Sequence, residues 1–247
     1  MFGKQKVAMI VAEFFGTAVL ASVALAVLEI RGFPLFFLGI AMAAVYGVFW
    51  LMLGRTSSAQ LNPVVTVGLW TLRKIQTTQA IVLIAAQGLG GLVAWRLNEY
   101  LLHTTLTKIT GKQFDWRVLI AEALGTLILG MGVAAALYNE TDDLTKALTI
   151  AGSVFLGVNV ASFASNGLLN PAVELGVRSL SWSYGIGALV GGVAGINLYA
   201  WLFAPAGAVA RAAVTTSSAK VVTTTTKKKV SSRKKVVAKK PATRKRK

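Results

Sequence analysis

Two Asn-Pro pairs are the residues whose type and spacing point most directly to chemistry. They occur as Asn62-Pro63-Val64 and Asn170-Pro171-Ala172, 108 residues apart, and each lies within a block of apolar segments. Asn is a favoured helix cap and Pro is best tolerated at the first helical position, so each pair predicts the start of a helix. A helix N-terminus carries about +0.5 of a charge, and the Asn amide donates hydrogen bonds. Each pair is therefore expected to repel cations and to donate to the oxygen of a small molecule.

The sequence around the two pairs repeats as well. Residues 12–17 read Ala-Glu-Phe-Phe-Gly-Thr, and residues 121–126 read Ala-Glu-Ala-Leu-Gly-Thr. A glycine also follows each Asn six residues later, at Gly68 and Gly176. The chain is therefore predicted to contain two copies of one unit within a channel domain at residues 1–203, repeat one at about 7–97 and repeat two at about 116–203.

The composition predicts a membrane protein. Hydrophobic residues make up 55% of the 247 residues, charged residues make up 14%, and the mean hydropathy is +0.63. An apolar helix of about 20 residues can cross a bilayer. Six such stretches are present: Val7 to Leu28, Leu35 to Leu53, Thr78 to Leu97, Val118 to Tyr138, Leu144 to Phe163 and Tyr184 to Phe203. The first is too long for the apolar region of a cleaved signal peptide and contains Glu13.

Three spans per copy require the second copy to lie in the membrane with the opposite orientation. Such inverted repeats place the functional site at their interface near the midplane. Asn62 to Leu72 and Asn170 to Leu180 are each long enough for about three helical turns, roughly 15 Å, and two such pieces match the roughly 30 Å of a bilayer core. The predicted fold class is an all-α membrane protein with six transmembrane helices, two re-entrant half-helices and an inverted 3+3 repeat.

The distribution of basic residues predicts the topology. Lys4 and Lys6 precede the first span, Arg55, Arg73 and Lys74 lie between the second and third, and a dense basic cluster follows the sixth. Because Lys and Arg concentrate on the cytoplasmic side, both termini are expected in the cytoplasm, with the plasma membrane as the location. The loop at residues 139–146 holds three acidic residues and one Lys, but acidic residues count little in this rule.

Further motifs extend the pattern. Ala86-Gln87 and Gly90-Gly91 lie in the third span, and Gly187-Ala188-Leu189-Val190-Gly191-Gly192 lies in the sixth. With the paired Asn-Pro motifs, these residues resemble the major intrinsic protein family, the aquaporins and glycerol facilitators, over roughly residues 7–203. Separately, Gly187, Gly191 and Gly195 recur every four residues, which predicts a groove of small residues for close helix contact.

The resemblance implies a homotetramer with one pore in each subunit, passive conduction of water or small uncharged solutes, and neither a cofactor nor an enzymatic activity. Amide donors and the positive ends of half-helices are the known means by which aquaporin-type pores exclude protons. Asn62 and Asn170 are expected to act in this way. They would orient a passing molecule so that a proton wire is interrupted.

Glu13 and Glu122 occupy matching positions in the two repeats. A carboxylate inside an apolar span costs at least a few kcal/mol, so each requires a partner. The family pattern implies that each accepts hydrogen bonds from a re-entrant loop, whereas the alternative is that each lies near enough to a span end to reach water. Their duplication favours the first interpretation. A catalytic acid and base pair is disfavoured, because the two lie in separate halves without a nucleophile or metal set.

Selectivity in the family depends on four filter positions. Ungapped matching from the motifs places Met42, Val158, Gly167 and Val173 there, and a shift of one residue in the fifth span would replace Val158 by Asn159. Val173 stands where the family usually has Arg. Loss of a guanidinium removes a charge and several donors, so the filter is expected to be wider and more apolar, and glycerol, urea and ammonia become candidates beside water.

Other residues bear on the same question. Arg178 begins roughly 7 Å further along a helix, at about 1.5 Å per residue, and is not expected to replace the missing Arg. Glu174 occupies a position where glycerol facilitators carry Asp, which favours the glycerol branch. The short loop at residues 98–116 and Val64 in place of Ala weigh against it.

The C-terminal residues have a different composition. Residues 204–247 hold 14 of the 26 basic residues and none of the 9 acidic residues, so they carry a charge of +14. This segment is expected to be a disordered cytoplasmic tail that binds anionic lipid, at about 1 kcal/mol for each nearby Lys or Arg, with nucleic acid as the rival partner. A non-conducting membrane anchor with such a tail is the alternative function. His103 is the single His and Cys is absent, which excludes a His/Cys metal site.

Overall fold

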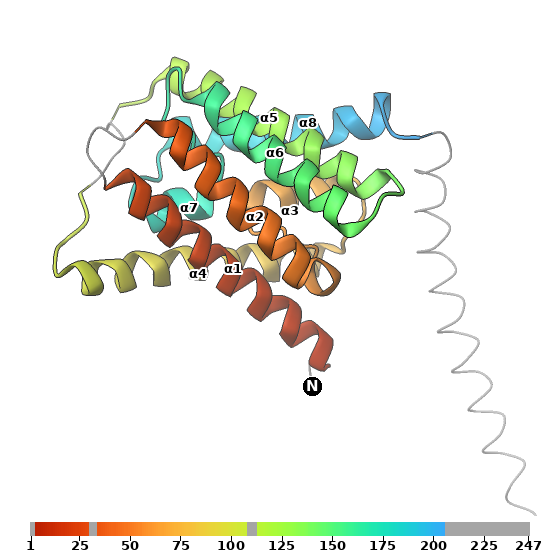
Figure 1. Ribbon diagram of the computed structural model, residues 1–247, viewed down its shortest axis with the longest axis horizontal. Coiled ribbons are helices and arrows are strands. Elements are labelled where there is room, and N and C mark those ends of the chain that lie inside the picture. The colour runs from red at the N-terminus through yellow and green to blue at the C-terminus, as the bar shows by residue number, and fades with distance from the viewer. Residues whose placement is uncertain (1–2, 30–33, 108–112, 206–247) are drawn as a thin grey trace, which may run out of the picture. The chain divides into compact units, whose positions relative to one another are not determined.

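The computed structural model describes residues 3–29, 34–107 and 113–205, and these residues form eight helices and no strand (Figure 1). The helices are α1 (Lys4–Leu28), α2 (Leu35–Ser57), α3 (Pro63–Thr71), α4 (Thr77–Leu102), α5 (Trp116–Tyr138), α6 (Asp143–Ala161), α7 (Pro171–Gly176) and α8 (Trp182–Leu202). The described residues as far as Ala204 belong to one compact unit. The predicted basic tail lies outside the described residues, apart from Ala204 and Pro205.

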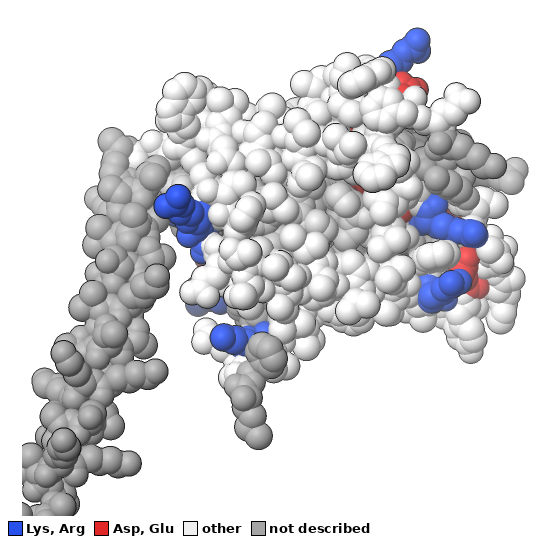
Figure 2. Space-filling view, turned by 180° about the vertical axis from the view of Figure 1, so that it is seen from behind, with Lys and Arg blue, Asp and Glu red and all other residues white. Residues whose placement is uncertain are grey.

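Six of the helices are long and apolar enough to cross a membrane. They are 19 to 26 residues long and correspond to the six predicted spans. On the face that Figure 2 shows, the exposed charged side chains of the described residues gather toward two opposite ends, with a broad uncharged band between them. The prediction of six transmembrane helices is therefore confirmed, and the chain is a multi-pass integral membrane protein.

The packing of the helices follows the repeat. In the first half α1 packs against α2 and α4, and in the second half α5 packs against α6 and α8, while α2 and α6 join the halves. Each short helix packs mainly against a long helix of the opposite half: α3 against α8, and α7 against α4. Because each short helix packs on the opposite half, both short helices lie at the interface of the halves.

Small residues allow the long helices of the second half to approach closely. A Cβ atom at Gly187, Gly191 or Gly195 of α8 would meet a backbone carbonyl oxygen of α5, in turn that of Leu119, Ala123 or Leu127. The predicted groove of small residues is therefore confirmed, and α5 fills it.

The second short helix differs from its prediction. The helix α7 ends at Gly176, four residues before the expected end at Leu180, whereas α3 spans nearly all of its predicted range. Arg178 adopts a left-handed backbone conformation with φ 55°, and the N–H of Ser179 donates to the carbonyl of Glu174 at 2.7 Å. These features close the last turn, as in common helix C-terminal motifs.

Candidate functional site

Each motif Asn caps the short helix that follows it. The Oδ1 atom of Asn62 accepts from the N–H of Val64 at 2.9 Å, and the Oδ1 atom of Asn170 accepts from the N–H of Ala172 at 3.0 Å. The two backbones agree closely, with φ −154° at Asn62 and −155° at Asn170. Because capping uses the oxygen of each amide, the NH2 group remains available as a donor.

The two caps meet through reciprocal hydrogen bonds. Asn62 Nδ2 donates to the carbonyl of Leu169 at 2.9 Å, and Asn170 Nδ2 donates to the carbonyl of Leu61 at 2.7 Å. Each amide therefore binds the residue that directly precedes the other Asn. The structure thus brings the two half-helix starts together, and Asn170 Nδ2 directs its second hydrogen to the hydroxyl of Tyr46 at 3.3 Å.

The residues before each Asn have an unusual backbone. Leu61 and Leu169 have positive φ angles of 52° and 53°, a region that non-glycine residues visit rarely. Such a conformation costs of order 1–3 kcal/mol and persists only where the surroundings impose it. The surroundings must therefore hold both loops.

The two glutamates hold these loops in the same way. Glu13 accepts from the N–H of Gln60 at 2.9 Å and of Leu61 at 2.7 Å. Glu122 accepts from the N–H of Leu168 at 3.1 Å and of Leu169 at 2.7 Å. Both side chains are completely buried, so these charge-assisted hydrogen bonds replace water.

Polar side chains complete each glutamate site, a serine in both halves and also a glutamine in the first. Gln87 of α4 donates to Glu13 at 2.7 Å and to Thr66 of α3 at 2.9 Å. In the second half the hydroxyl of Ser165 donates to Glu122 at 2.7 Å. Ser165 lies five residues before Asn170, as Ser57 lies five residues before Asn62, and Ser57 also forms a hydrogen bond with Glu13. This repeated spacing is the signal that could have identified both serines.

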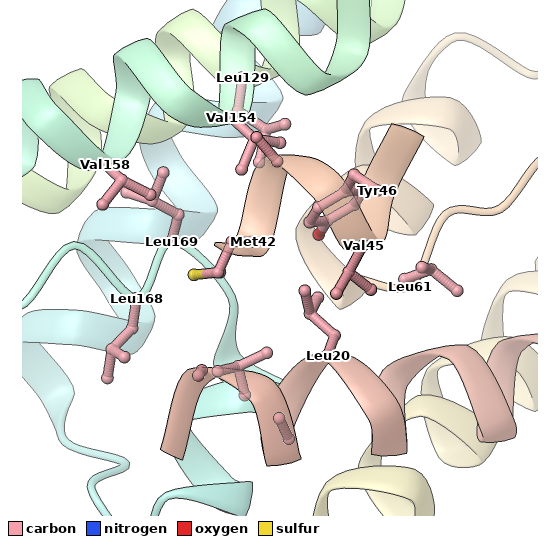
Figure 3. Packing of buried hydrophobic residues seen from close by; sticks show 14 of the residues in the cluster. Leu20, Met42, Val45, Tyr46, Leu61, Leu129, Val154, Val158, Leu168 and Leu169 are labelled. Carbon is pink, nitrogen blue, oxygen red and sulfur yellow. The ribbon is translucent and has the colours of Figure 1, made fainter. Parts of the chain in front are cut away.

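The four expected filter residues are all buried. Figure 3 shows two of them, Met42 and Val158, within the buried apolar cluster. Gly167 has a φ of 61°, and a Cβ atom there would lie 2.9 Å from the carbonyl oxygen of Val158. Asn159 instead faces Gly39 of α2 and donates to the carbonyl of Phe155 at 2.8 Å. The structure therefore brings Val158 against Gly167 and leaves Asn159 outside that contact.

A sequence profile named "Major intrinsic protein" matches residues 3–199. The chain belongs to the major intrinsic protein family.

Several members of this family are similar in sequence. Aquaporin-4 of Homo sapiens is 28% identical over 166 residues, which cover 62% of this chain and 51% of that protein. Aquaporin-1 of Mus musculus is 29% identical over 166 residues, covering 62% of each. A probable glycerol uptake facilitator protein of Thermotoga maritima is 29% identical over 183 residues, covering 62% of this chain and 77% of that protein. The matched part of the chain spans about half the length of aquaporin-4.

A solved structure supports the same fold. The aquaglyceroporin from Plasmodium falciparum superposes with a TM-score of 0.64 at 19% identity, covering 81% of this chain and 98% of the other. The chain therefore has the fold of the aquaporins, with six long helices and two re-entrant half-helices.

Arg178 of this major intrinsic protein binds residues of and after α4. Its Nη1 atom donates to the carbonyl of Leu106 at 2.7 Å, and its guanidinium lies 5.4 Å from the centre of the Trp95 ring. Val173 is completely buried. Arg178 is therefore tied to α4 and the residues after it, as its distance along the chain suggested.

Tyr46 is a site residue of this family member that the sequence did not single out. Its hydroxyl lies 3.3 Å from Nδ2 of Asn170, also interacts with the Asn62 side chain, and is 2% exposed as a residue. Tyr46 follows Met42 by four residues, which places both on one face of α2. That spacing is the signal that could have identified it.

Proposed function

We propose that the chain is a passive channel for water or small uncharged solutes, with the junction of Asn62 and Asn170 at the centre of its pore. The reciprocal hydrogen bonds between the two caps carry this proposal. They bring two helix N-termini to one point, so each contributes about +0.5 of a charge that repels cations. The remaining amide hydrogens are placed to donate to a permeating oxygen and to interrupt a proton wire.

Family membership supports a channel over an enzyme. Within the described residues no group of three or more His, Cys, Asp and Glu is placed to hold a metal ion. Glu13 and Glu122, the candidate acid and base, are each occupied by two backbone N–H groups. Neither carboxylate is free to exchange protons with a substrate.

We assign the outer selectivity filter to Met42, Val158, Gly167 and Val173. The contact between Val158 and Gly167 supports Val158, in place of Asn159, as the filter residue of the fifth span. Arg178 does not supply the missing guanidinium, since it binds the carbonyl of Leu106. An apolar filter admits solutes larger than water, and the names of the relatives include both aquaporins and a glycerol uptake facilitator.

The assembly is proposed to be a homotetramer in the plasma membrane with both termini in the cytoplasm. Large apolar side chains are exposed on both sides of the α2 and α6 contact, and these need lipid or a second subunit as cover. They are Phe36, Phe37, Ile40, Val48, Leu51 and Met52 on α2 and Leu144, Leu148 and Leu156 on α6.

Flux through reconstituted protein tests the channel. Proteoliposomes should shrink faster than empty liposomes under an osmotic gradient, and a panel of glycerol, urea and ammonia should show which solutes follow water. A proton gradient across the same membrane should decay no faster than in empty liposomes. Solute flux equal to that of empty liposomes would remove the channel proposal.

The charge of +14 on residues 204–247 favours a second, compatible role in binding anionic lipid, with nucleic acid as the rival partner. Deleting residues 206–247 should leave solute flux unchanged and abolish salt-sensitive binding to anionic vesicles. If the deletion spares vesicle binding but abolishes retention of duplex DNA, nucleic acid is the partner of the tail.

A further inference from the structure

The phenol of Tyr46 occupies a position that a permeating molecule would need. Its oxygen lies 3.3 Å from Nδ2 of Asn170, the amide that also donates to Leu61. A phenol can accept and donate a hydrogen bond, as a water molecule or an alcohol can. Tyr46 therefore competes with any solute for the second hydrogen of Asn170.

Apolar side chains also lie around Tyr46. Figure 3 shows the ring of Tyr46 among Leu20, Val45, Leu61, Leu129 and Val154, all apolar. A solute at this point has the Asn amides as its main hydrogen-bond donors. To accept from the second hydrogen of Asn170, it must replace the phenol oxygen there.

One small cavity beside Tyr46 is the size of a single water. The cavity next to the ring measures about 10 Å³ and is bordered by Trp50, Gln60, Val65 and Ile150. About this volume is the least that can hold one water molecule. The Oε1 atom of Gln60 is buried without a hydrogen-bond partner, so a water in this cavity would find an acceptor. A three-carbon polyol requires several times this space.

We propose that Tyr46, rather than the outer filter, sets the size limit for solutes in this channel. The inference rests on the proposed channel function and narrows its substrate class. The outer filter of Met42, Val158, Gly167 and Val173 lacks the guanidinium that would narrow it. Tyr46 restores a narrow passage at the centre, where it admits molecules of the size of water or ammonia and excludes glycerol.

Two substitutions separate the bulk of Tyr46 from its hydroxyl. Tyr46→Ala removes both, and the ratio of glycerol to water permeability should rise at least about ten-fold. Tyr46→Phe keeps the ring, so glycerol should stay excluded while water flux rises by up to about ten-fold, the effect of one ordinary hydrogen bond on a rate. Tyr199→Ala is the matched control, because Tyr199 lies on α8 with its hydroxyl on Asn139 and should leave the ratio unchanged.

Stopped-flow light scattering on proteoliposomes measures both permeabilities, with tetramer elution as the check on folding. A wild-type ratio equal to that of Tyr46→Ala would overturn the role of Tyr46 while leaving the channel in place. A large rise in glycerol flux with Tyr46→Phe would overturn the size limit as well, because the ring is retained. Absence of flux in all variants, with intact tetramers, would overturn the channel and this inference together.

Discussion

Asn170 donates its side-chain amide to the carbonyl of Leu61 over 2.7 Å, although 109 residues separate them. The matching bond from Asn62 to Leu169 closes a ring of two caps and two strained leucines. In this ring each half of the chain fixes the half-helix of the other. Damage to the support of one loop is therefore expected to reach both caps.

Glu13→Gln tests that support. Glu13 uses both oxygens, one for Gln60 and the other for Leu61 and Gln87, whereas a glutamine offers one oxygen and places an NH2 group against donors. We expect the free energy of unfolding to fall by about 3 kcal/mol. The variant should show a lower melting temperature in detergent and a loss of solute flux. Glu29→Gln, just after α1, is the control and should change neither. Equal melting curves for the two variants would contradict the supporting role of Glu13.

Glu174 is also a buried carboxylate, but its surroundings differ from those of Glu13. Neither of its oxygens has a hydrogen-bond partner among the described residues, and the side chain is completely buried. An unpaired buried charge is costly, so Glu174→Gln should raise the melting temperature, by an amount that corresponds to about 1–3 kcal/mol. A lower melting temperature would show that the ionised carboxylate has a stabilising partner.

The close contact of α5 and α8 predicts different responses from two glycines. A Cβ atom at Gly191 would meet the carbonyl oxygen of Ala123, whereas Gly88 of α4 has no neighbour within 4 Å of such an atom. Gly191→Ala should destabilise the protein by about 1–3 kcal/mol through overpacking. Gly88→Ala should stabilise it by up to about 1 kcal/mol through helix propensity. Thermal unfolding of both variants measures the two effects. If both substitutions shift the melting temperature in the same direction, the packing described is contradicted.

The start of α6 predicts an acid dependence. Asp142 accepts from the N–H and the hydroxyl of Thr145 at 3.0 and 2.6 Å, and these bonds hold the pKa of Asp142 below its ordinary value of 3.8. A carboxylate with a lowered pKa stabilises the fold above its unfolded pKa, and that contribution is lost as the pH falls through the folded value. The melting temperature should therefore fall below about pH 4.

Asp142→Asn isolates this effect, because asparagine also caps helices but does not titrate. The variant should show a smaller decline of melting temperature in acid than the wild type. An identical decline would mean that other carboxylates account for it.

Local chemistry made much of this site predictable. Asn followed by Pro specifies a helix start wherever it occurs, and a carboxylate in an apolar span requires a partner. The sequence therefore indicated the caps at Asn62 and Asn170 and the need for partners at Glu13 and Glu122. The six spans followed from length and apolar composition alone.

Features that depend on long-range geometry were not predictable. The contact of Tyr46 with Asn170 joins residues 124 positions apart and exists only because α2 passes the junction of the half-helices. The early end of α7 depends on a left-handed Arg178, a residue type with no particular preference for that conformation. The proposed choice of Val158 over Asn159 depends on the rotation of α6 about its axis, which residue counting does not supply.

The pore centre is tested most directly by blocking it at Asn170. Osmotic shrinkage of proteoliposomes should be fast for the wild type and close to that of empty liposomes for Asn170→Phe, since the ring would fill the place of the amide. Asn98→Phe, a substitution of the same kind on α4, should keep the wild-type rate. Fast shrinkage with Asn170→Phe, in a variant that elutes as the wild type does, would contradict a pore through the Asn62 and Asn170 junction.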